Sequence, residues 1–289
     1  MKSKNPHLYY LFLLNLGMLF ISTSGILGRY IALPPPISIW FRSLIALIIL
    51  LLYSRHKKFS LKIEWEKHGS AVCWSGFLLA LHWITYFFAL QLSNVAIGML
   101  SLFTYPIITV FLEPFFIPVK LQKRHLLLGF LIMIGIYILV PDFDIKNNAT
   151  QGLLIGLFSA FTYSLRNLII KKHNNMGNSS IQMIYQLAVI VILLTPVHWV
   201  YHDIDISSEW PYLIILGTIT TALGHTLFLS SFSHFKISTA SIISSIQPIF
   251  GVLLGVLFLS EIPDLKSMLG GILILVTVVI ESRKSKMKK

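Results

Sequence analysis

The sequence predicts an all-α integral membrane protein, with ten transmembrane helices arranged as two inverted five-helix repeats. Three observations predict this fold: the scarcity of charge, the long apolar blocks, and a pattern that recurs after 142 residues. Of the 289 residues, 55% are hydrophobic and 12% are charged, whereas a soluble globular domain averages about 25% charged residues. Because the apolar residues form continuous blocks instead of one-sided stripes, the solvent that these blocks require is lipid.

Ten segments of the chain are apolar enough to span a bilayer, since a helix needs about 20 apolar residues to cross the hydrocarbon core. The blocks lack the period-two alternation of barrel strands, which favours helices. The expected spans are 8–32, 36–53, 69–91, 95–117, 125–141, 152–170, 180–201, 210–231, 237–259 and 266–281. The first of these is too long for the apolar region of a signal peptide, so we expect it to be retained.

The placement of lysine and arginine predicts the orientation, because cytoplasmic loops carry an excess of both. With ten spans, eighteen of these residues lie on the side of the N-terminus, and only Lys146 and Lys266 lie opposite. Both termini are therefore expected in the cytoplasm, with the chain in a plasma or inner membrane. The net charge of +12 is then explained by anionic lipid headgroups on the cytoplasmic side. No nucleic acid is expected, since no long basic face is present.

Several classes of site are excluded by what the chain lacks. The single cysteine, Cys73, leaves no internal disulfide and no CxxC site. The phosphate-binding pattern GxxxxGK[ST] is absent, which argues against ATP-driven transport by this chain alone. No catalytic residue, metal or cofactor is expected. The expected partners are a small-molecule solute and the bilayer, and a homodimer is left open.

The chain repeats itself approximately when it is shifted by 142 residues, a shift that aligns Pro106 with Pro248. The two halves are residues 1–145 and 146–289. Because each half contains an odd number of spans, the halves must insert with opposite orientation. Such inverted-topology repeats recur in secondary transporters, where each half can open toward one side of the membrane.

Loose motifs occur along nearly the whole chain. They are Phe41-Arg42 after a Pro-rich turn, the mid-span Pro106 and Pro248, the segment Leu259-Ser260-Glu261, and Gly270-Gly271. Together they resemble the EamA-type transporters of the drug/metabolite transporter superfamily. The resemblance implies transport of metabolites such as amino acids, often as export, through a central cavity between two EamA-like halves. The first half departs from the pattern, because Val119-Lys120 stand where the second half has Glu261-Ile262.

Polar side chains at mid-depth in the spans predict a central binding site, because lipid cannot satisfy their hydrogen bonds. The residues expected to contact the solute are His82, Tyr86, Tyr105, Tyr163, His225 and Gln247. The aromatic rings among them favour a solute with an apolar portion. For the two histidines, the alternative is a structural role with bonds to neighbouring helices.

Charged residues within the spans are candidates for coupling or gating. Arg42 either snorkels to the interface, or caps the central cavity or pairs with an anionic group of the solute. Arg166 is expected to snorkel toward the cytoplasm. Glu113 is either a proton-coupling carboxylate or the ion-pair partner of basic residues just beyond it, namely Lys120, Lys123 and Arg124.

The aligned prolines, Pro106 and Pro248, are further candidates for gating. Each removes a helix hydrogen bond and frees a carbonyl in mid-membrane, which lipid does not tolerate but a cavity does. A kink at each proline is therefore expected near the binding site.

The pattern favours a secondary transporter that works by alternating access between the two halves, and not an enzyme. The alternative is an integral membrane enzyme acting on a lipid-linked substrate. Such an enzyme usually gathers acids, histidines or a metal pair near one interface, and no HxxE or DxD cluster is present. A channel would need a polar ring from repeated segments, and none is visible.

Overall fold

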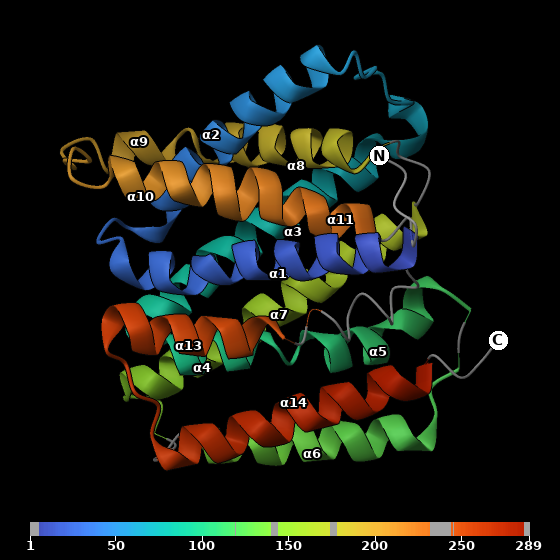
Figure 1. Ribbon diagram of the computed structural model, residues 1–289, viewed down its shortest axis with the longest axis vertical. Coiled ribbons are helices and arrows are strands. Elements are labelled where there is room, and N and C mark those ends of the chain that lie inside the picture. The colour runs from blue at the N-terminus through green and yellow to red at the C-terminus, as the bar shows by residue number, and fades with distance from the viewer. Residues whose placement is uncertain are drawn as a thin grey trace.

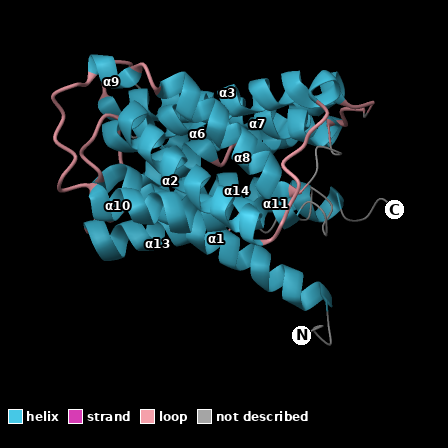
Figure 2. Ribbon diagram, turned by 90° about the horizontal axis from the view of Figure 1, so that it is seen from above, coloured by secondary structure: helices cyan, strands magenta, loops and turns pink. Residues whose placement is uncertain are grey.

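The computed structural model describes residues 6–118, 120–139, 144–173, 178–231, 244 and 246–285. Within these ranges the chain forms helices and loops and no strand (Figure 2), so the predicted all-α class is confirmed there. Part of the expected span 237–259 and several of the basic residues near both ends of the chain lie outside the described residues.

The helices follow one another with short connections (Figure 1). In the first half they are α1 (Pro6–Tyr30), α2 (Pro35–His56), α3 (Trp65–Leu92), α4 (Val95–Leu102), α5 (Tyr105–Phe116) and α6 (Lys123–Leu139). In the second half they are α7 (Asn148–Lys172), α8 (Ser179–Leu194), α9 (Val197–Val200), α10 (Trp210–Ile215), the π-helix η1 (Leu216–His225), α11 (Thr226–Ser231), α13 (Gln247–Leu259) and α14 (Leu265–Ser285).

Seven helical segments of the described chain are long and apolar enough to cross a membrane. Three shorter apolar helices accompany them, at His125–Ile138, Gln247–Leu259 and Leu265–Thr277. Segments of this length and composition require a bilayer. The chain is therefore an integral membrane protein.

The expected span 95–117 is broken into two helices and is not a single kinked helix. Phe103 and Thr104 separate α4 from α5. Pro106 explains the break, because it has no N–H to donate to the carbonyl of Leu102 and its ring would clash there. In the first turn of a new helix the missing N–H costs nothing, and Pro106 and Pro248 both occupy that position, in α5 and α13.

One hydrogen bond occurs twice, once at the start of each proline-containing helix. Ser164 Oγ on α7 donates to the Tyr105 carbonyl at 2.9 Å, and Ser22 Oγ on α1 donates to the Gln247 carbonyl at 3.1 Å. The two serines are 142 positions apart, and so are the two acceptors. Each bond joins a helix of one half to a helix of the other.

The packing of the helices also pairs off between the halves. Helix α3 packs along α7, and α1 packs along η1 and α11. Helix α5 packs on α7, and α13 packs on α1. Helix α2 lies against α8, and α6 lies against α14 at one edge of the bundle (Figure 1). When the two halves are exchanged, the contact of α3 with α7 becomes that of η1 and α11 with α1, and the contact of α5 with α7 becomes that of α13 with α1. The contacts of α2 with α8 and of α6 with α14 map onto themselves.

Small residues allow the helices near the centre to approach closely, as small-xxx-small spacing usually does in membranes. A Cβ on Gly152 would lie 2.7 Å from Ser93 Cβ, and a Cβ on Gly156 would overlap Ser101 Oγ. These contacts bring α7 onto α3 and α4, whose ends carry part of the central site.

Replacing Gly156 by valine should destabilise the protein, because the new side chain has no room beside Ser101. Overpacking of this kind typically costs about 1–3 kcal/mol, so the melting temperature in detergent should fall. A second change, Ser101→Gly, removes the overlapping hydroxyl and should recover part of the loss. An unchanged melting temperature for Gly156→Val would contradict this packing of α7 on α4.

Candidate functional site

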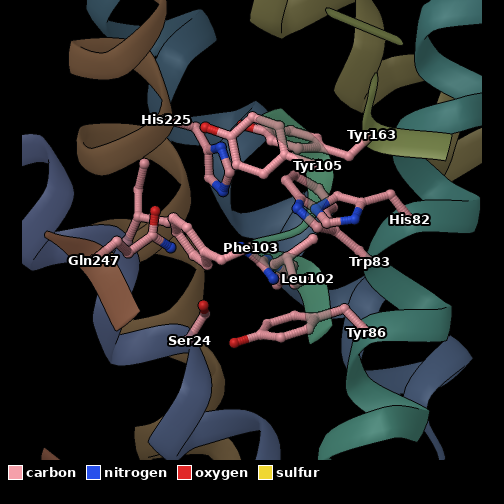
Figure 3. A pocket seen from close by; sticks show the side chains of 12 residues that line it. Ser24, His82, Trp83, Tyr86, Leu102, Phe103, Tyr105, Tyr163, His225 and Gln247 are labelled. Atoms are coloured by element: carbon pink, nitrogen blue, oxygen red, sulfur yellow. The ribbon is translucent and has the colours of Figure 1, made fainter. Parts of the chain in front are cut away.

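A buried cavity lies near the middle of the bundle, at the point where α4 ends and α5 begins (Figure 3). Its walls come from both halves, through α1, α2, α3, α7, η1 and α13. The residues that line it are Ile21, Ser24, Arg42, His82, Trp83, Tyr86, Leu102, Phe103, Tyr105, Tyr163, His225 and Gln247. All six residues that the sequence predicts to contact a solute are therefore brought together, with Arg42 beside them.

The cavity is narrow. Its volume is about 20 Å³, which is room for about one ordered water. An organic solute does not fit into this volume, so the helices around the cavity must separate before one can bind.

His82 belongs to a closely packed aromatic wall. Its Nδ1 lies 2.8 Å from Ser159 Oγ on α7, and the same hydroxyl donates to the His82 carbonyl at 2.8 Å. The imidazole stacks on Tyr163 with ring centroids 4.4 Å apart, and Tyr105 meets Tyr163 edge-on at 4.9 Å. These contacts join α3 to α7, and they match the structural role given above as the alternative for His82.

His225 is placed differently. It ends the π-helix η1 and is buried, with its ring 5.2 Å from that of Trp83. Its Nδ1 is buried and has no hydrogen-bond partner. Buried polar atoms are normally paired, so this nitrogen is available to a group that enters the cavity.

The remaining predicted contacts also face the cavity (Figure 3). Tyr105 Oη is hydrogen-bonded to Ser244 Oγ at 2.8 Å. Tyr86 is 2% exposed, and its hydroxyl points toward Ser24 (Figure 3). Gln247, 8% exposed, begins α13 just before Pro248.

Arg42 does not snorkel to an interface. It is 1% exposed and lines the cavity, which is the second of its two predicted positions. Its Nε donates to Thr221 Oγ1 at 2.8 Å, and its guanidinium carbon lies 4.1 Å from the ring centroid of Trp83.

The prediction that Arg166 snorkels toward the cytoplasm is wrong. The side chain is 0% exposed. Its Nε donates to Gln186 Oε1 at 2.8 Å, and its Nη1 donates to Asn167 Oδ1 at 3.0 Å. Amide oxygens of α7 and α8 thus replace the water that snorkelling would have provided.

Glu113 lies away from the cavity, three residues before the end of α5. It forms an ion pair with Lys171 on α7, a partner that the sequence does not suggest. The expected pairing with the basic residues just beyond it therefore names the wrong partner. A lysine on a helix of the other half takes their place.

Some residues of the site carry no clear signal in the sequence. Trp83 could have been found, because the 142-residue register places it opposite His225. Thr221 shares the polar face of its span with His225, a face expected to turn inward, but its bond to Arg42 could not be predicted. Ser159 could not be found, because a hydroxyl on a membrane helix usually bonds its own backbone. Only the fold shows that these two hold His82 and Arg42 in place.

Comparisons with known proteins agree with this architecture. A model of the EamA-like transporter family matches residues 8–140 and again residues 150–283. The pseudopaline exporter CntI of Pseudomonas aeruginosa is 23% identical over 257 residues, which is 88% of each chain. An uncharacterized transporter of Archaeoglobus fulgidus is 24% identical over 200 residues, covering 69% of this chain and 72% of its own.

The fold is also present in a solved crystal structure. That structure superposes with a TM-score of 0.71 and covers 96% of this chain and 98% of its own, at 16% sequence identity. A likeness at this identity concerns the fold alone. The two consecutive matches to one family model span most of the sequence, and the chain belongs to the EamA-like transporter family.

Proposed function

We propose that the protein is a secondary transporter that exports small organic metabolites, such as amino acids, by alternating access. The observation that carries this proposal is the buried cavity built from residues of both halves. A site at the junction of two halves can be exposed to one side of the membrane and then to the other when the halves move against each other. The name of the Pseudomonas relative, an exporter, supports the direction.

The proposal includes ten transmembrane helices with both termini in the cytoplasm. The seven long segments and the three shorter apolar helices together support this number. Helices α1 and α7 run in opposite directions through the bundle (Figure 1), and so do α3 and η1. The repeated bond from Ser22 and Ser164 supports the same inverted relation between the halves.

Two ion pairs support alternating access, because each joins the halves at one end of the bundle. Arg29, near the end of α1, pairs with Glu261 after α13 at 2.9 Å, and Lys171, near the end of α7, pairs with Glu113 on α5. Arg29 and Lys171 are 142 positions apart, so the basic partners are equivalent in the repeat. We infer that each pair closes one end of the transport path.

The alternative of a lipid-modifying enzyme has less support. In the described ranges no three His, Cys, Asp or Glu side chains gather where they could hold a metal ion. The two acids nearest the ends of the path, Glu113 and Glu261, are both engaged in ion pairs. Neither is poised as a general acid or base at a lipid surface.

Replacing His225 by alanine should abolish most transport with a smaller loss of stability than the same change at His82, since its Nδ1 makes no bond within the protein. Membrane vesicles with and without the protein are loaded with a mixture of amino acids and central metabolites, and release is followed by mass spectrometry. Wild type should release at least one solute faster than empty vesicles, and His225→Ala should not.

His82→Ala is the matched control, because this histidine is bonded to Ser159. The variant loses the bond between Nδ1 and Ser159 Oγ, worth about 0.5–1.5 kcal/mol, and the stacking on Tyr163, so the melting temperature should fall. Equal losses of stability for the two histidine variants would contradict the distinction between them. The absence of any solute that wild type releases faster would contradict the transporter proposal.

Reversing the charge of Glu113 should impair closure at its end of the path. A partly exposed ion pair contributes about 1 kcal/mol, or about a fivefold change in the ratio of closed to open states. Glu113→Lys should therefore slow release of the same solute, and the double variant Glu113→Lys/Lys171→Glu should restore it. Glu64→Lys breaks an exposed pair with Lys67 and should have no effect. Failure of the double variant to recover, with normal folding, would argue against a gate.

A further inference from the structure

Arg42 carries an unpaired positive charge inside the central site. The side chain is 1% exposed, and both Nη1 and Nη2 are buried without a hydrogen-bond partner. Arginine stays protonated in proteins and always presents a positive charge. A buried charge is normally paired with an opposite charge, so the site lacks a counterion of its own.

The guanidinium is held in a fixed orientation by two neighbouring elements. Thr221 of η1 accepts the bond from Nε, which anchors one edge of the plane. Trp83 of α3 covers one face, with its ring centroid 4.1 Å from the guanidinium carbon. The Nη1 and Nη2 groups are therefore the part of the side chain that is left to bind something in the cavity.

No acidic side chain in the described part of the chain approaches this arginine. The ion pairs there are Arg29–Glu261, Lys67–Glu64, Lys171–Glu113 and His202–Asp203, and none of them lies at the cavity. A second buried arginine, Arg166, stands behind Tyr163 with its guanidinium carbon 6.0 Å from the ring. Its partners are neutral amides, so the two arginines make the centre of the bundle electropositive.

We propose that the transported solute carries a carboxylate, which binds the Nη1 and Nη2 groups of Arg42. This inference rests on the transporter proposal and specifies its solute. Two parallel N–H groups match the two oxygens of a carboxylate, and such bidentate pairs are among the strong hydrogen bonds in proteins. The ring of Tyr163 and the neighbouring Phe103 offer contact to an apolar part of the same molecule.

The first arm of the test measures stability without a solute. An unpaired buried charge destabilises the empty protein, so Arg42→Met, which keeps the length and removes the charge, should raise the melting temperature. An arginine that served only packing would give a lower melting temperature in the same variant. Arg55→Gln on the exposed end of α2 is the control for loss of one positive charge, and should leave the melting temperature unchanged.

The second arm measures binding by thermal shift with matched probes. These are glutamate and glutamine, phenylalanine and phenylalaninamide, and 4-phenylbutyrate and 4-phenylbutyramide, tested on wild type, Arg42→Gln and Arg55→Gln. A ligand of the folded state raises its melting temperature. Carboxylates should stabilise wild type and Arg55→Gln, and should bind Arg42→Gln at least about tenfold more weakly.

The carboxylate proposal is overturned if the amides stabilise wild type as well as the carboxylates do, if Arg42→Gln keeps the full shift, or if no carboxylate probe produces a shift. Vesicle release separates this failure from failure of the transporter proposal. If wild type and Arg42→Gln release a solute equally, the transporter proposal stands and the carboxylate site is excluded. If carboxylates bind in a way that depends on Arg42 but no bound probe is released from vesicles, the carboxylate site stands and the transporter proposal is contradicted.

Discussion

Every polar group inside this bundle must find its partner within the protein or in a cavity, because the hydrocarbon around the helices offers none. Two equivalent buried hydroxyls follow this constraint. Ser22 and Ser164 bond their own helices and the carbonyls at the starts of α13 and α5. Around the cavity the constraint is only partly met, since Arg42 and His225 keep unpaired nitrogens. These unpaired nitrogens lie where the two halves meet.

The π-helix η1 contributes to this arrangement. Its wider turn lets Thr221 Oγ1 donate to the Leu216 carbonyl five residues earlier, at 2.8 Å, while the same oxygen accepts from Arg42. His225 follows Thr221 by four residues and faces the same cavity. Stretches of π-helix are frequent at functional sites because they redirect side chains at some cost in helix stability. Here the stretch places an anchor for the arginine and an unpaired imidazole side by side.

Much of the fold and of the site could be predicted from sequence, because lipid makes hydrophobic length and polar depth informative. The described helices begin and end within a few residues of most expected spans, and the residues expected to contact a solute all line one cavity. The break before Tyr105 could not be predicted, because a proline in a membrane helix can either kink that helix or start a new one. Arg166 was misplaced because sequence position gives depth but does not show which neighbours supply acceptors. The partner of Glu113 lies 58 positions away, on a helix of the other half, and no local pattern identifies such a contact.

We propose that one site, built from both halves, opens in turn to each side of the membrane. This proposal is tested by a single cysteine at Ser24, which lines the cavity, in a Cys73→Ala background, with an impermeant thiol reagent applied to right-side-out and inside-out vesicles. The cysteine at Ser24 should be labelled from both sides. A cysteine at the exposed Asn147 should be labelled from one side only. Labelling at Ser24 from one side alone, in a protein that still transports, would contradict alternating access through this cavity.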